Sequence, residues 1–287
     1  MIKNSIRLAV PLVLAAGLLS SCASAPTQAS RAEMEAEARR AFNQMRASMP
    51  LVTDRETIDF VACVAQAVVE VLEPPYNDIE WELAVFEAES VNAFAMPGGK
   101  IGVLSGILKV TENEHQLATV IGHEIAHVTA DHSADRAMNT DLTRIGINVA
   151  AVILGGGYSG ATYTAQQALA AGAAFGISLP YKRGQESEAD VIGLEYMARA
   201  GFDPRESVPL WQRMDAGGGK RPAEFLSTHP ASETRIENLV NEWQKTLPLY
   251  NQALAEGRRP DCGGASPRYV KEVEPGSEEQ EPEKEGT

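Results

Sequence analysis

Apolar residues recur every three or four positions in several parts of the chain, which is the spacing of one face of an α-helix. Sequences typical of a capping box, Thr53–Glu56 and Thr111–Glu114, open two of these parts. Pro74 and Pro75 follow the first of them and end its helix. The pattern predicts helices over residues 54–73, 111–128, 185–200 and 233–247, and a charged, alanine-rich surface helix over 31–49.

Three short stretches between the first two long helical patterns have the apolar content of β-strands. They are residues 81–86, 92–96 and 100–104, and a Pro-Gly-Gly turn at 97–99 separates the last two. Helices around a small sheet make an α+β arrangement, and this is the predicted fold class.

The first 22 residues have the features of an export signal. Lys3 and Arg7 give a positive start, and residues 8–19 form an uncharged apolar run that is shorter than a membrane-spanning helix. The run ends in Leu-Ser-Ser-Cys22, which resembles the bacterial lipobox, where the cysteine is acylated and becomes the first residue. Ala23 follows, and in such lipoproteins a residue other than Asp favours the outer membrane. The alternative is an ordinary secretory signal cleaved nearby.

The composition is that of a globular protein, with 44% hydrophobic residues among 287, enough for one large domain. The 39 Asp and Glu residues outnumber the 25 Lys and Arg residues and give a net charge of −14. So acidic a chain gains nothing from the counterion release that drives nucleic-acid binding, and that class of function is excluded. Because no basic patch assists, attachment to a membrane depends on the acyl chains of Cys22.

The chain has three cysteines, too few for a small disulfide scaffold or a thiolate metal cluster. If Cys22 carries lipid, Cys63 and Cys262 remain as two thiols in an oxidising compartment. We expect a disulfide between them. The alternative is two buried free thiols.

Composition divides the chain after the signal into three parts. Residues 23–53 make a tether and an N-terminal helix, residues 54–262 the main domain, and residues 263–287 an acidic tail whose composition predicts disorder. Within the main domain, residues 145–181 carry no charge, and glycines interrupt their apolar run well below spanning length. We interpret this stretch as a buried or membrane-skimming helical hairpin and not as a transmembrane pair.

The sequence His123-Glu124-Ile-Ala-His127 lies on the helix predicted over 111–128. Histidines four residues apart project from one helical face, where two imidazole nitrogens can bind one Zn²⁺. Glu124 is rotated away from this face, enough to reach a water on the open side of the metal without binding the metal itself. The zinc lowers the pKa of that water, and the carboxylate can take its proton and pass it to the departing amine.

Zinc in a catalytic site needs a third protein ligand. The metzincin pattern is excluded because its glycine and third histidine are absent here, and a thermolysin-like glutamate is excluded because none occurs between His127 and Glu186. Glu186 and Asp190 share one face of the helix predicted over 185–200, and Glu188 points away from it. One carboxylate of this pair can bind the metal while the other orients a ligating imidazole. The alternative for such an acidic cluster is a solvated helix start.

Four motifs in this order resemble a known family. They are Asn-Ala-Phe-Ala-Met-Pro-Gly-Gly at 92–99, the His-Glu-x-x-His helix, Glu-Ser-Glu-Ala-Asp at 186–190, and Ser-Thr-His-Pro at 227–230 with Arg235 after it. From about residue 54 to 243 the chain is similar to the Ste-type zinc metallopeptidases, gluzincins that include HtpX, the CAAX prenyl protease and bacterial periplasmic lipoproteins of the BepA and LoiP type. The resemblance implies a mainly helical, zincin-like protease domain with one zinc ion per chain. It also implies that Glu186 is the third ligand and that Asp190 supports a ligand.

The resemblance gives roles to two further residues. His229 matches a histidine that sits over the metal in relatives, either as a fourth ligand in a closed resting state or as a stabiliser of the tetrahedral oxyanion. Arg235 occupies the arginine position of the family and is expected to support the same loop. His115 and His132 match no motif, and we interpret both as structural.

The strand predicted over 92–96 suggests how a substrate binds. As a sheet edge beside the metal helix, Asn92, Ala93 and Phe94 would hold substrate backbone in extended form by main-chain hydrogen bonds. Such binding is largely blind to side chains. The alternative is an ordinary hairpin edge.

The sequence therefore predicts a zinc-dependent endopeptidase, anchored by lipid in the outer membrane and facing the periplasm. Its expected substrates are unfolded, misfolded or misassembled envelope proteins. A second hypothesis is a periplasmic chaperone or assembly factor with latent protease activity.

Overall fold

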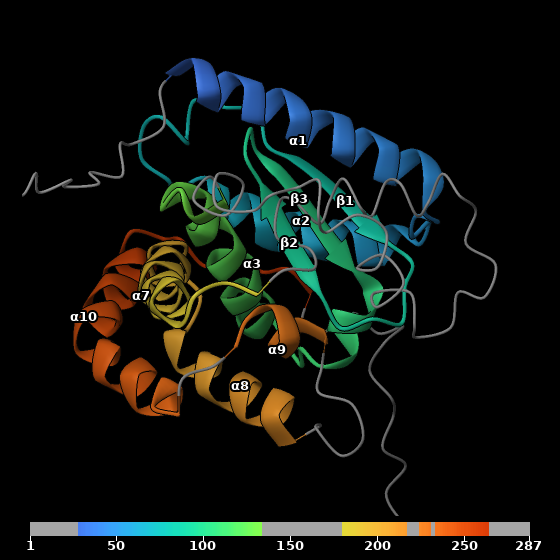
Figure 1. Ribbon diagram of the computed structural model, residues 1–287. Coiled ribbons are helices and arrows are strands. Elements are labelled where there is room, and N and C mark those ends of the chain that lie inside the picture. The colour runs from blue at the N-terminus through green and yellow to red at the C-terminus, as the bar shows by residue number, and fades with distance from the viewer. Residues whose placement is uncertain (1–27, 134–179, 217–223, 231–232, 264–287) are drawn as a thin grey trace, which may run out of the picture.

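The computed structural model describes residues 28–133, 180–216, 224–230 and 233–263 (Figure 1). Three predicted features lie outside these ranges: the export signal with Cys22, all but the last two residues of the uncharged stretch 145–181, and the acidic tail after Gly263. Among the described helices, none is both long and apolar enough to cross a membrane.

The α+β class predicted from the sequence is confirmed: helices predominate and surround a three-stranded sheet. The long helices and the strands fall where the apolar pattern predicts them, and the structure adds α8 and α9. The helices are α1 (Gln28–Ser48), α2 (Arg55–Val69), α3 (Glu114–Thr129), α7 (Arg183–Arg199), α8 (Ser207–Ala216), α9 (Glu224–Thr228) and α10 (Arg235–Ala255). The strands are β1 (Glu82–Phe86), β2 (Ala93–Met96) and β3 (Lys100–Leu104).

Two helix starts differ from the predicted capping boxes. Asp54, not Thr53, caps α2, and its side chain accepts a hydrogen bond of 3.0 Å from the backbone N–H of Thr57. Asn113, not Thr111, caps α3 in the same way. Both corrections have one physical reason: Asp and Asn are better caps than Thr, and each stands closer to the helix.

The sheet has the strand order β1-β3-β2, with β1 parallel and β2 antiparallel to the central β3. Helix α1 lies across one face of it (Figure 1). Alternate residues of β2 serve the two faces: Phe94 and Met96 pack in the cluster with α1, and Ala93 in the larger core with α2 and α3. The edge strand β2 is therefore held next to the helix that carries the His-Glu-x-x-His motif.

Helices α3 and α7 cross at two glycines. A Cβ on Gly122 would lie 2.9 Å from the carbonyl oxygen of Gly193, and a Cβ on Gly193 would lie 2.8 Å from the backbone nitrogen of His123. Only hydrogen in place of a side chain permits this approach. The contact brings the start of α7, which carries Glu186 and Asp190, against the histidines of α3.

The expected disulfide between Cys63 and Cys262 is present. It joins α2 to the segment that follows α10, two parts of the chain that lie 199 residues apart. The N- and C-terminal parts of the described domain are thus covalently tied.

Candidate metal centre and active site

Helix α3 brings two imidazoles together in the interior. His123 and His127 lie one turn apart, both are buried, and their Nε2 atoms are 3.1 Å from each other. The ring planes are nearly perpendicular, and the short distance between the two nitrogens places both at one position beside the helix.

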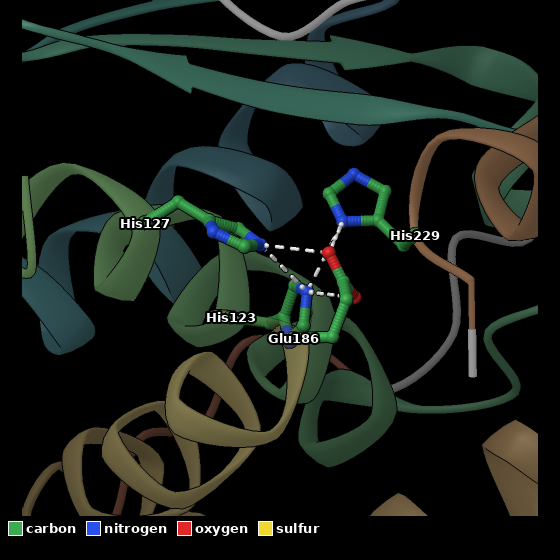
Figure 2. Close-up of side chains that lie close together, drawn as sticks. All are labelled: His123, His127, Glu186 and His229. Carbon is green, nitrogen blue, oxygen red and sulfur yellow. Dashed lines mark hydrogen bonds and ion pairs between the residues drawn. The ribbon is translucent and has the colours of Figure 1, made fainter. Parts of the chain in front are cut away.

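Glu186 of α7 and His229, just after α9, complete the group (Figure 2). The two carboxylate oxygens of Glu186 lie 3.3 Å from Nε2 of His123 and 3.3 Å from Nε2 of His127. Nδ1 of His229 lies 3.1 Å from Glu186 and 3.2 Å from Nε2 of His123. Three separate parts of the chain thus meet at one buried point.

The spacing of these donors fits one zinc ion. A tetrahedral site with bonds of about 2.0–2.1 Å has ligand atoms about 3.3 Å apart. The contacts among the four residues measure 3.1–3.3 Å, and one ligand atom from each of them lies within 4.8 Å of all the others. Three imidazoles and a carboxylate are also ligand types that zinc prefers.

Burial and contacts with neighbouring side chains shift the pKa values of the residues in this group. Burial works to lower the pKa of His123, but hydrogen bonds with Asp190 and Glu186 raise it to about 9. Burial, together with the neighbouring imidazoles, holds the pKa of His127 well below its usual value. Burial alone would raise the pKa of Glu186, yet its contacts with the histidines keep it far below the usual range. The carboxylate is therefore ionised, as a metal ligand must be.

Asp190 and Arg235 support this arrangement from outside. Oδ1 of Asp190 lies 3.0 Å from Nδ1 of His123, so the carboxylate fixes that ring with its Nε2 lone pair turned to the cluster. Arg235 donates to both oxygens of Asp190, at 2.7 and 2.6 Å, and its guanidinium lies 3.5 Å from the centre of the Trp211 ring. The contacts of Asp190 thus fit the support role expected for it, and Arg235 contacts Asp190 directly.

Glu124 is buried next to the cluster without joining it. Its Oε1 lies 3.4 Å from Nε2 of His229, whose other ring nitrogen faces Glu186 and His123. The His229 ring therefore stands between the carboxylate expected to act as base and the ligand atoms.

His132 and Glu188 were not predicted to be near the site. Nδ1 of His132 lies 2.9 Å from Nδ1 of His127, and its Nε2 lies 3.2 Å from Oε2 of Glu188. The interpretation of His132 as structural did not anticipate this contact, which forms because α3 ends at Thr129 and the chain turns at Asp131. His115, in contrast, accepts a 3.3 Å hydrogen bond from the backbone of Asp203, a structural contact.

The strand predicted to bind substrate lies beside α3, as expected, but its side chains are buried in contacts within the protein. Phe94 is buried and stacks on Phe86, and Asn92 is buried with its Oδ1 bonded to the backbone N–H of Ala93. A role in substrate binding at Asn92, Ala93 and Phe94 thus falls to the backbone of β2 and remains a prediction.

Comparison with known proteins places the chain in one family. The model of "Peptidase family M48" matches residues 59–243. The chain is 39% identical over 188 residues to "Mitochondrial metalloendopeptidase OMA1" of Schizosaccharomyces pombe, a match that covers 65% of this chain and 51% of that protein. It is 36% identical over 185 residues to the Saccharomyces cerevisiae protein of the same name, covering 62% and 51%.

A bacterial protein is similar over a longer part of the chain. The "Beta-barrel assembly-enhancing protease" of Escherichia coli O157:H7 is 30% identical over 218 residues, which is 73% of this chain and 44% of that protein. The chain spans about half the length of the curated relatives it matches, or somewhat less. The family model covers more than half of the chain and includes His123, Glu124, His127 and Glu186. This chain therefore belongs to peptidase family M48, and its buried donor atoms have the spacing of a zinc site.

Proposed function

We propose that this protein is a zinc-dependent endopeptidase in which His123, His127 and Glu186 hold the metal and Glu124 is the general base. The observation that supports this most strongly is the spacing of the donor atoms, which matches one tetrahedral zinc ion, with a buried carboxylate beside it that is not a ligand. The named metalloendopeptidase relatives support the same assignment.

The chemistry divides between the metal and the chain. A bound zinc would acidify water and polarise a peptide carbonyl. Glu124 would accept the proton as the water attacks the carbonyl carbon and would deliver it to the amine nitrogen as the C–N bond breaks. Asp190, held by Arg235, would keep His123 oriented throughout.

We assign His229 the role of a plug in the resting protein. Its Nδ1 lies among the ligand atoms and its Nε2 faces Glu124, so the ring fills the space that a water and a scissile carbonyl would need. His229 follows α9. The backbone N–H of Phe225 in α9 donates a hydrogen bond to the carbonyl of Val91, just before β2. Extended substrate that pairs with β2 would thus reach the segment that carries the plug.

The proposed location is the outer membrane, with a lipid on Cys22 and the domain of residues 54–262 facing the periplasm. The lipobox-like sequence supports the anchor, and the Cys63–Cys262 disulfide fits an oxidising compartment. The proposed substrates are misfolded or misassembled envelope proteins. A relative named for the assembly of β-barrels supports that choice.

One experiment tests the activity and the plug together. Purified protein is analysed for metal and incubated with casein, with and without a chelator of divalent cations, beside His229→Ala. We expect about one zinc per chain, cleavage that the chelator abolishes, and faster basal cleavage by His229→Ala. Absence of bound zinc would refute the metal assignment, whereas loss of cleavage in His229→Ala would favour an oxyanion role for this histidine.

The alternative function is a chaperone or assembly factor with latent proteolysis. The position of His229 between Glu124 and Glu186 supports this alternative, because it closes the site in the resting protein. Glu124→Gln separates the two functions because it removes the base and leaves the ligands intact. We expect it to bind zinc normally and to lose about 10²–10⁴-fold in casein cleavage. If cells that carry only this variant keep a normal envelope, the chaperone function is the relevant one.

A further inference from the structure

His132 is a buried histidine that no motif assigns, and it touches a zinc ligand. Its ring lies 5.1 Å from the ring of His127, and their Nδ1 atoms are 2.9 Å apart, so one of these two nitrogens must carry the shared hydrogen. The other nitrogen of His132 faces Glu188, whose side chain is 60% exposed. The three side chains form a line from solvent to the metal site.

The hydrogen-bond chemistry gives this line a direction. A carboxylate only accepts, so Nε2–H of His132 donates to Glu188. With this hydrogen on Nε2, Nδ1 of His132 is the nitrogen that can accept, and Nδ1–H of His127 donates to it. This leaves the lone pair of His127 on Nε2, the nitrogen that lies among the ligand atoms. The outer carboxylate thus selects the tautomer that can bind a metal.

We propose that His132 and Glu188 are positioning residues for the zinc ligand His127. They do for His127 what Asp190 does for His123, except that an imidazole relays the effect of the carboxylate. The stacked ring of Tyr181, 3.6 Å from the His127 ring at an angle of 7°, fixes the plane of the ligand, and His132 fixes its rotation within that plane.

The backbone shows how the relay is built. Helix α3 ends at Thr129, and Asp131 has a φ of 56°, the left-handed conformation that Asp tolerates better than most residues. This residue turns the chain back, so that His132 meets His127 only five positions later in the sequence. Helix α7 supplies the opposite partners: Glu186 at the metal, Asp190 behind His123 and Glu188 behind His132. Helix α7 therefore supplies one carboxylate to the metal position and one to each of the two histidines His123 and His132.

The inference rests on the proposed zinc site, and the first test measures zinc affinity by competition with a chromogenic chelator. His132→Leu keeps an apolar filler but removes the acceptor, and we expect zinc to bind about 10- to 100-fold more weakly. His132→Asn can place its side-chain oxygen near the former Nδ1, and we expect it to retain affinity within about threefold of the parent. A packing role predicts the opposite order, because Leu fills a buried site better than Asn.

Glu188→Lys tests the outer end. A lysine only donates, so it favours the wrong tautomer of His132, and we expect zinc affinity to fall about tenfold. Glu195→Lys is the matched control, since it reverses the same charge on α7 away from His132 and should leave affinity unchanged. Equal losses in the two variants would overturn the role of Glu188.

Nitrogen NMR of the zinc-loaded parent protein decides the tautomer even if a variant fails to fold. We expect a protonated Nδ1 and a metal-bound Nε2 on His127. A deprotonated Nδ1, or zinc binding by His132→Leu within about twofold of the parent, would overturn the relay. A parent protein that binds no zinc would instead refute the proposed function, so the two failures are distinguishable.

Discussion

The substitution Gly193→Ala tests whether the crossing of α3 and α7 sets the metal site. The new Cβ would lie 2.8 Å from the backbone nitrogen of His123 and 2.9 Å from the carbonyl carbon of Gly122. Ordinary contacts between such atoms are about 3.5–4.0 Å, so the helices must separate by roughly 0.7 Å or more. Both atoms are backbone of a buried helix and cannot turn aside.

This displacement acts on the ligand that α7 supplies. The oxygens of Glu186 lie 3.3 Å from the two histidine nitrogens of α3, and zinc sites tolerate errors of only about 0.2 Å in their bonds. We expect Gly193→Ala to weaken zinc binding about 10- to 100-fold. Overpacking costs about 1–3 kcal/mol, and the higher helix propensity of alanine returns about 0.5–1 kcal/mol, so the zinc-free protein should lose roughly 0–2.5 kcal/mol.

The assay is competition for zinc with a chelator, combined with urea unfolding of the zinc-free protein. Gly184→Ala is the control on the same helix, because a Cβ there meets nothing within 4 Å. It should raise stability by up to about 1 kcal/mol and leave zinc affinity unchanged. If Gly193→Ala binds zinc as tightly as Gly184→Ala does, the close crossing does not control the site.

Three further predictions follow from contacts around the site. Arg235→Met removes the guanidinium that donates to both oxygens of the buried Asp190 carboxylate and should cost about 3–5 kcal/mol in urea unfolding of the zinc-free protein, a loss under 1 kcal/mol being inconsistent with this pairing. Replacing Cys63 and Cys262 by Ala removes a link across 199 residues and should lower the free energy of unfolding by about 2–5 kcal/mol, and an unchanged urea midpoint would contradict it. Because hydrogen bonds outweigh burial and raise the pKa of His123 to about 9, a proton competes with zinc below that pH. Calorimetry should then detect about one proton released per zinc near pH 7.5 and an apparent affinity that falls about tenfold per unit decrease in pH, whereas a flat profile would exclude the competition.

The local sequence pattern predicted the positions of most helices and strands, and it was less accurate about where some of the helices begin and end. Helices α2, α3 and α7 and all three strands lie within a few residues of their predicted bounds, because apolar periodicity and turn residues act locally. The N-caps of α2 and α3 were misplaced by one and two residues, since two candidate caps lie close together in each case and only the folded backbone selects between them. Helix α10 runs to Ala255, past Pro248, where the sequence predicted an end at 247.

The sequence by itself determined which residues within each helix face the metal site. Helical geometry alone places His123 and His127 on one face and Glu124 off it, and the same rule pairs Glu186 with Asp190. What only the tertiary structure decided is which distant groups meet there. The crossing at Gly122 and Gly193 delivers Glu186, and the fold seats His229 between the ligands and Glu124.

The contact between His132 and His127 could not be predicted from the sequence, for a physical reason. Helical periodicity describes side chains only while the helix continues, and α3 ends at Thr129. One residue in the left-handed conformation, Asp131, then reverses the chain and places His132 against His127. A single backbone dihedral, which no local pattern specifies, thus decides whether this histidine is remote from the metal or in contact with its ligand.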